Sequence, residues 1–259
     1  MKGGRVAALA GAASLFLSGV ARADCPAAGD SIITDRPTVA NSSSVVPAAS
    51  LQFENGFGAS QSRSVTTIDL PETRARLGLV DCTEFLVDLP DYYRTDRRGG
   101  VEGASNLGPA LKHQFQGMPD GVTLSGAIGV FLNSGDKRIA GRGPAPYLQL
   151  PWSTDLGEGW SLNGMLGLTF HPRDPDGNPS NQATLYLDQT IADNADLFVE
   201  YANDFQRDAP TLNRLSLGGS YRATPTTQLD LKLGAGLNAA SPDWYLLIGY
   251  SVRFDQLWR

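Results

Sequence analysis

Charged residues flank a short turn near residue 82, and their spacing suggests an electrostatic role. Antiparallel pairing around the turn at 81–83 would place Arg74 roughly opposite Asp88, with Arg76 diagonal to Asp88 and near Glu84. Side chains at such cross-strand positions interact directly. The cluster is therefore either a charged constriction that selects solutes or an ion-pair network that packs a narrow interior.

A second charged group is acidic. Pairing around the turn at 192–195 would bring Asp188 near Glu200, with Asp204 farther along the same strand. Opposed carboxylates are costly unless they are hydrated, bound to a cation or partly protonated. This spacing predicts an acidic patch that favours cationic or neutral solutes.

Catalytic and metal-binding chemistry has little support in the sequence. A hydrolase would need a nucleophilic serine beside a base that a third group orients, and the chain has two histidines. His113 lies on an apolar face, and His171 lies in a proline-rich loop. The acidic loop at 174–178 lacks the glycine and glutamate that a helix-flanked calcium loop requires. We therefore expect no catalytic residue, metal or cofactor.

The chain contains two cysteines, Cys25 and Cys82. In an exported protein they would meet an oxidising compartment, and we place both on the periplasmic side. If they pair, the closed loop of about 57 residues constrains the unfolded chain by about 4 kcal/mol in the chain-entropy model. The alternative is two unpaired thiols.

The elements that would position these residues are strands with alternating apolar side chains. The runs are longer than the usual strand of about five or six residues and match the roughly 9–11 tilted residues that cross a bilayer. The candidate strands are 50–58, 70–80, 84–91, 106–116, 122–132, 143–153, 160–170, 181–191, 196–205, 211–222, 228–238 and 243–254. An even number suits antiparallel closure. The sequence thus predicts an all-β fold, a transmembrane antiparallel β-barrel of about twelve strands over residues 50–259.

The second face of these strands indicates which side points inward. It carries regularly spaced polar and charged residues among Gly, Ala and Ser, with Arg253 in the last strand. In lipid the apolar face must point outward, so these polar residues would line a wet lumen. Trp152 and Trp160 flank one short turn, and Trp244 begins the last strand at the opposite end, as expected for aromatic girdles at the two membrane interfaces.

The residues before the barrel suggest export. Lys2 and Arg5 precede an apolar stretch, and Ala21-Arg22-Ala23 fits a cleavage site. We expect residues 1–23 to be a signal peptide cleaved after Ala23, and residues 24–49 to be a periplasmic segment that partly plugs the barrel. Cleavage removes three basic residues and no acidic one, which takes the formal net charge from −6 to −9. That charge argues against nucleic acid as a partner.

Several motifs together resemble an outer-membrane family named for the meta-pathway of phenol degradation. They are Thr34-Asp35-Arg36-Pro37, the strand from Leu70-Pro71-Glu72-Thr73 to Gly78, Ser134-Gly135-Asp136, and the terminal strand ending Arg253-Phe254. The resemblance covers nearly the whole mature chain. It implies a bacterial outer-membrane barrel with a transport role, whose partners are membrane lipid, a small-molecule solute and the barrel-assembly machinery. Phe254 or Trp258 would supply the terminal aromatic residue that this machinery reads.

The predicted barrel and its narrow polar lumen favour passage of small solutes by diffusion, and the family resemblance implies that these are organic solutes, aromatic ones included. Barrels of eight strands are filled by side chains and those of sixteen or more hold open channels, so twelve strands predict a partly blocked pore. The alternatives are a structural or adhesion barrel and a barrel lipid hydrolase.

Overall fold

A computed structural model describes residues 25–96, 99–171 and 177–258. The signal peptide predicted at 1–23 lies outside these ranges. No helix among the described residues is long and apolar enough to span a membrane.

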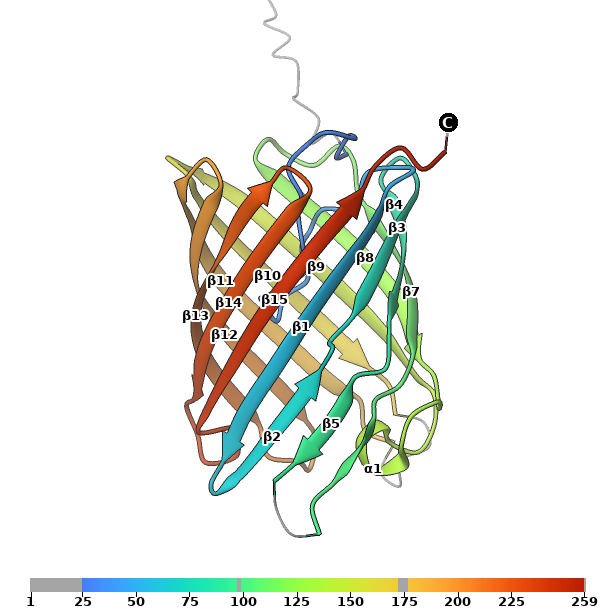
Figure 1. Ribbon diagram of the computed structural model, residues 1–259, viewed down its shortest axis with the longest axis vertical. Helices are drawn as coiled ribbons and strands as arrows, with labels where there is room; N and C mark the ends of the chain where they lie inside the picture. Colours follow the sequence, from blue (N-terminus) through green and yellow to red (C-terminus); the bar gives the residue numbers. More distant parts are fainter. Residues whose placement is uncertain (1–24, 97–98, 172–176, 259) are drawn as a thin grey trace, which may run out of the picture.

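The described residues form fifteen strands and one short helix. The strands follow one another around an antiparallel sheet, and the last pairs with the first. Their bounds are β1 (Leu51–Ser62), β2 (Val65–Leu70), β3 (Arg74–Val80), β4 (Thr83–Asp88), β5 (Tyr92–Thr95), β6 (Glu102–Ala104), β7 (Gly108–Gln114), β8 (Val122–Phe131), β9 (Ala145–Gly157), β10 (Trp160–Thr169), β11 (Ser180–Ala192), β12 (Ala195–Gln206), β13 (Leu212–Thr224), β14 (Thr227–Gly236) and β15 (Trp244–Phe254). Figure 1 shows the resulting barrel, with strands tilted to its long axis.

The fifteen strands make twelve crossings of the wall, because three crossings are each broken into two strands. The broken crossings are β2 with β3, β4 with β5, and β6 with β7. The pairing shows this, because β1 pairs with both β2 and β3. On their other edges, β2 pairs with β5 and β3 pairs with β4. The prediction of a closed twelve-stranded antiparallel barrel is confirmed. The sequence did not predict the breaks, which lie side by side at 71–73, 89–91 and 105–107. Pro71 contributes to the first, since proline has no N–H for the ladder.

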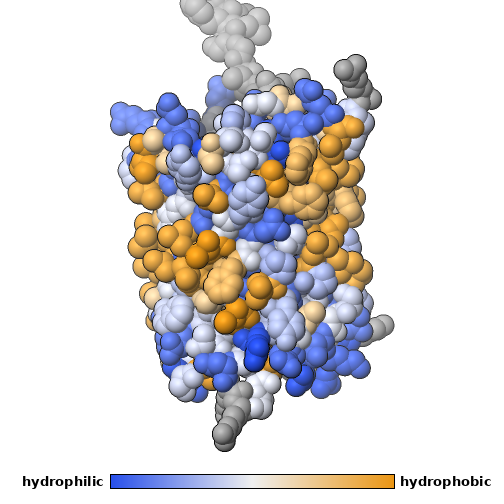
Figure 2. Space-filling view, viewed as in Figure 1, coloured by the Kyte–Doolittle hydropathy of each residue, from blue (hydrophilic) through white to orange (hydrophobic). Residues whose placement is uncertain are grey.

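The outer surface carries an apolar belt between polar ends (Figure 2). Side chains alternate along each strand, as in β13, where Leu215 and Leu217 are exposed and Ser216 is buried. Ile128 and Leu217 are each 62% exposed, whereas the lumen residues Arg76 and Glu84 are both 0% exposed. This distribution is the inverse of a water-soluble protein and matches a wall that faces lipid.

The two ends of the barrel differ. Short turns such as those between β3 and β4 and between β13 and β14 lie at the end that also holds the C-terminus (Figure 1). The opposite end carries the longer connections and helix α1 (Lys137–Ala140), which Asp136 caps through its carboxylate. The sequence did not predict this helix. Short periplasmic turns and longer external loops are usual in such barrels.

Candidate functional site: the lumen and the N-terminal segment

The N-terminal segment, residues 25–50, crosses the lumen before it joins β1. Figure 1 shows this blue segment entering at the short-turn end and running inside the wall. Its backbone bonds to widely separated strands: the Val46 N–H donates to Glu84 of β4, and the Val39 N–H donates to Glu200 of β12 at 2.6 Å. The segment therefore touches opposite sides of the barrel.

Two arginines and two acids from the β3–β4 hairpin form the core of a charged cluster. Arg74 is paired with Asp88 in the strand register, and its Nε lies 2.6 Å from Asp88 Oδ1. Arg76 reaches Glu84 at 3.0 Å and Glu54 of β1 at 2.9 Å. The side chains of Arg76, Glu54 and Glu84 are fully buried.

Asp35 of the N-terminal segment lies at the centre of this cluster. Its carboxylate is 2.8 Å from Arg74 and 3.4 Å from both Arg76 and Lys112. Burial alone would raise the pKa of Asp35, but the three cations together hold that pKa well below its usual range. Asp35, Glu54 and Lys112 were not predicted as site residues, although Asp35 belongs to the Thr34–Pro37 motif.

Arg36, the next residue of the same motif, lies against the β1–β15 wall. It forms an ion pair with Glu72, lies 3.5 Å from Asp230, and donates to the Ile248 carbonyl at 3.3 Å. The motif therefore binds residues 72 and 74, at the break before β3 and at the start of β3, through two adjacent residues of opposite charge. Both motifs belong to those on which the family resemblance rests, and the structure shows that they contact each other.

The acidic patch predicted from Asp188 and Glu200, with its preference for cationic or neutral solutes, stays a prediction, but Glu200 does not lie directly opposite Asp188 and has a cationic partner. The register pairs Glu200 with Tyr186, and its carboxylate is 3.0 Å from Lys232 of β14. Asp204, likewise, forms an ion pair with Arg214. The two cations lie in β13 and β14, outside the β11–β12 hairpin on which the prediction was based.

The remaining predicted lumen residues lie nearer the short-turn end. Asp188 lines a cavity of about 170 Å³ together with Asp196 and Arg222, which form an ion pair with each other. Arg253 pairs with Asp255 at 2.7 Å and donates to the Asp30 carbonyl at 2.6 Å. Arg253 thus fastens the start of the N-terminal segment to the end of the last strand.

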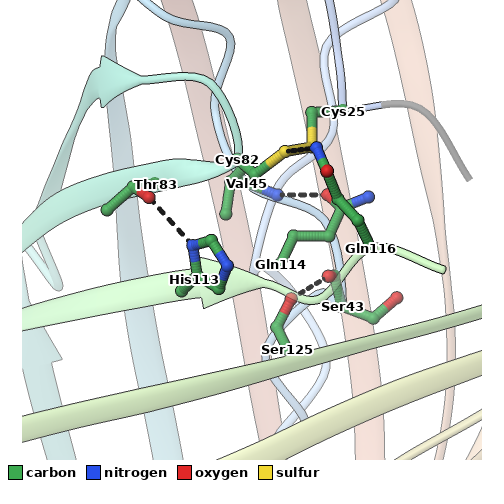
Figure 3. Close-up of a disulfide and its surroundings, with 9 residues drawn as sticks. All are labelled: Cys25, Ser43, Val45, Cys82, Thr83, His113, Gln114, Gln116 and Ser125. Atoms are coloured by element: carbon green, nitrogen blue, oxygen red, sulfur yellow. Dashed lines mark hydrogen bonds between the residues drawn. A yellow bond between two sulfur atoms is a disulfide. The ribbon is translucent and has the colours of Figure 1, made fainter. Parts of the chain in front are cut away.

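A disulfide joins Cys25 to Cys82, with Cα atoms 5.2 Å apart. Figure 3 shows it at the β3–β4 turn, beside Gln116. It attaches the N-terminal segment to the hairpin that carries Arg74 and Arg76. The segment is therefore held as a closed loop, covalently at residue 25 and by chain continuity at β1.

Two cavities in the lumen lie along the N-terminal segment, and a third, of about 430 Å³, lies beside the disulfide, where Cys25, Ala48 and Gln116 line it. The larger lumen cavity, of about 640 Å³, opens toward the long-loop end and is lined by charged residues together with Leu89, Tyr93, Phe131 and Ile139. The smaller lumen cavity, of about 170 Å³, lies toward the short turns. Arg36 and Thr38 line both cavities.

The two histidines occupy different settings. His113 is exposed, and its Nδ1 lies 2.9 Å from Thr83 Oγ1 (Figure 3). His171 lines the large cavity, and its Nε2 lies 2.9 Å from Ser180 Oγ, a contact that the sequence did not predict. Within the described residues, no group of three or more His, Cys, Asp or Glu side chains is placed to hold a metal ion.

A closed antiparallel barrel with an apolar belt and a polar lumen belongs to the class of outer-membrane β-barrels. The chain belongs to the family described as "Putative MetA-pathway of phenol degradation", whose profile matches residues 34–254. The match begins at Thr34, the first residue of the motif that binds the lumen wall.

Solved structures share this architecture at low sequence identity. An outer membrane channel from Pseudomonas putida F1 is 13% identical, with a TM-score of 0.63, 81% of this chain covered and 97% of that one. The NanC porin is 8% identical, with a TM-score of 0.55 and coverages of 78% and 98%. The β domain of the Bordetella autotransporter BrkA is 14% identical, with a TM-score of 0.51 and coverages of 80% and 100%. No curated protein matches the chain.

Proposed function

We propose that the protein is an outer-membrane channel that passes small organic solutes, aromatic ones included, by diffusion through a narrow polar lumen. The observation that carries the proposal is the 640 Å³ cavity inside a closed barrel whose outer face is apolar. The cavity has both charged and apolar lining, including Tyr93 and Phe131, which suits organic molecules with polar groups. The family description, which refers to phenol degradation, supports the aromatic part.

In this proposal residues 24–49 act as a partial plug. The support is the set of contacts that Asp35, Arg36 and Val39 make with separate parts of the wall. A solute must pass beside this segment, so the segment limits the size of what crosses. Arg74, Arg76 and Glu84 then hold the plug, and Arg74 with its partner Asp88 also lines the large cavity.

The proposal places the mature protein in the bacterial outer membrane after signal cleavage behind Ala23. Its apolar belt contacts lipid, and its final strand ends at Phe254, half exposed on the outer face. Because Phe254 is the last residue of β15, we assign it, ahead of Trp258, as the terminal aromatic residue for the assembly machinery.

The proposed passage involves no chemical step, and the lipid-hydrolase alternative rests on one observation. Ser180 and His171 are within hydrogen-bond distance, as a nucleophile and its base would be. A fluorophosphonate probe should leave the folded wild-type protein unlabelled. Labelling that Ser180→Ala removes would favour the hydrolase.

Single-channel conductance of purified protein in planar bilayers tests the channel. Wild type, Asp35→Asn and Asp30→Asn are compared after heat-modifiable gel migration has shown each barrel to be folded. Asp35→Asn removes the charge that three cations hold, so its conductance should exceed that of the wild type. Asp30 is an exposed residue of the same segment, so Asp30→Asn should match the wild type. Three folded barrels that all stay silent would overturn the channel proposal and favour a structural barrel.

A further inference from the structure

We propose that Arg36 is the residue that sets both the size and the charge selectivity of the path between the two cavities. The inference rests on the proposed channel function and deepens it. The side chain would narrow the path and offset negative charge there, so that uncharged solutes are not disfavoured relative to cations.

The position of Arg36 carries the first step. Arg36 and Thr38 border both the large and the small cavity, and Arg36 is the only arginine among the described residues that lines both. Arg74 and Arg142 line only the large cavity, and Arg222 lines only the small one. On the proposed path, a solute that moves from one cavity to the other would therefore pass beside Arg36 and Thr38.

Two glycines in the β1–β15 wall leave room for the Arg36 side chain. Gly56 and Gly249 face each other in the β1–β15 register. A Cβ on Gly56 would lie 2.3 Å from the guanidinium carbon, and a Cβ on Gly249 would lie 2.5 Å from Arg36 Nε. Real Cβ atoms do not approach so closely, so a larger residue at either position would shift the Arg36 side chain away from the wall.

The nitrogens of the Arg36 guanidinium differ in how well they are bound, and Nε is available to a solute. One end is bound to Glu72, while the other donates to the Ile248 carbonyl at 3.3 Å and lies 3.5 Å from Asp230. Arg36 Nε and both Asp230 carboxylate oxygens are buried without a hydrogen-bond partner in the structure. Buried polar atoms usually have a protein or water partner. These atoms supply a donor and acceptors beside the path, where water or a passing solute with both kinds of group would satisfy them.

The charges around Arg36 predict the direction of its effect. Glu72 lies on the side of the large cavity, Asp230 lies beside Gly249, and the Asp35 carboxylate is already held by three other cations. Removing Arg36 would leave Glu72 and Asp230 without their cation. A constriction lined by unpaired carboxylates favours cations.

The test compares Arg36→Gln with the matched control Arg214→Gln, which removes a lumen arginine that borders neither cavity and pairs with Asp204. Conductance and reversal potential are measured under a potassium chloride gradient, after heat-modifiable migration has shown the barrels to be folded. Arg36→Gln should increase the conductance and the cation-to-anion permeability ratio several-fold, and Arg214→Gln should leave both near the wild-type values. Unchanged values in Arg36→Gln would overturn the inference, as would equal shifts in both variants.

A second pair of variants keeps the charge and moves the side chain. A Cβ at Gly249 would lie 2.4 Å from both Asp230 carboxylate oxygens and 2.5 Å from Arg36 Nε, so Gly249→Ala would displace this pair and should change the conductance. Gly167→Ala should not, because a Cβ at Gly167 meets nothing closer than 3.4 Å. A conductance in Gly249→Ala equal to that of Gly167→Ala would count against the inference. If Asp35→Asn conducts while the Arg36 and Gly249 variants match the wild type, the channel stands and the role of Arg36 fails. If every folded variant is silent, both proposals fail.

Discussion

Two sides of the lumen carry ion pairs in different ways. On the side formed by β1, β3, β4 and β7, here called the plug wall, Arg76, Glu54 and Glu84 have no exposed side-chain surface. On the side formed by β11, β12 and β13, here called the far wall, Arg214 and Asp204 keep 20% and 29% of theirs. The ion pairs of the plug wall are more buried because the N-terminal segment lies over them and places Asp35 among their cations.

The comparison separates networks from local pairs. On the plug wall one carboxylate of the segment joins three cations, so the loss of one member removes several ion-pair contacts at once. The far-wall pairs Arg214–Asp204 and Arg222–Asp196 each join neighbouring strands and retain contact with water. Glu200, whose carboxylate accepts from the Val39 N–H of the segment, is buried together with its partner Lys232 of β14. Burial of charge in this lumen therefore marks where the segment lies.

The largest expected effect comes from Arg76. Arg76→Met would leave Glu54 and Glu84 as buried charges without their main partner, at a cost of about 3–5 kcal/mol in the free energy of unfolding. Arg214→Met, on the far wall, should cost about 1 kcal/mol or less, as for exposed pairs. Urea titrations of tryptophan fluorescence in liposomes would measure both. Equal losses at the two positions would break the comparison.

The disulfide ties the segment to the plug wall and gives the next effect. Cys25→Ser with Cys82→Ser opens a loop with a sequence separation of 57 residues, which should lower the free energy of unfolding by about 4 kcal/mol in the chain-entropy model. The same urea titration, with and without reductant, would measure the loss. Reductant should lower the wild-type midpoint and leave the double variant unchanged. A wild-type midpoint that reductant does not move would contradict this prediction.

The outer face offers a test that is independent of the segment. Ile128→Arg places a cation on an apolar position that is 62% exposed, and at the middle of a bilayer this costs about 2–4 kcal/mol. Asp120→Arg, in the turn before β8, should change the free energy of unfolding by about 0.5 kcal/mol or less. Liposome urea titrations would compare the two. Similar values would mean that Ile128 does not face the hydrocarbon.

The strands could be predicted from the sequence because their pattern is local. Alternation along each run gave twelve crossings, and one short turn was enough to place Arg74 opposite Asp88. The partners of Asp35 and Glu200 could not be found in this way. Asp35 lies in a segment without regular structure and meets Lys112 of β7. Glu200 of β12 meets Lys232 of β14, which is not the next strand along the chain. One signal in the sequence did point to a contact between the segment and the wall: Arg36 and Glu72 carry opposite charges and belong to the two motifs named in the sequence analysis.

The smallest effect concerns pH, and it tests whether the three cations or burial controls Asp35. A carboxyl whose pKa is lowered on folding stabilises the protein above its unfolded pKa of about 3.9, and this stabilisation is lost as the pH falls through the lower folded pKa. Because the pKa of Asp35 lies well below its usual range, the difference in unfolding free energy between wild type and Asp35→Asn should stay constant from pH 7 to about 5.

That difference should then shrink as the pH falls below about 4, while Asp30→Asn serves as the control for the segment. Urea titrations of the three proteins at pH 7, 5, 4 and 3 would follow it. A difference that already closes near pH 6 would mean that burial outweighs Arg74, Arg76 and Lys112. The plug wall would then hold a neutral Asp35, and its contrast with the hydrated pairs of the far wall would have to rest on Arg76 with Glu54 and Glu84 alone.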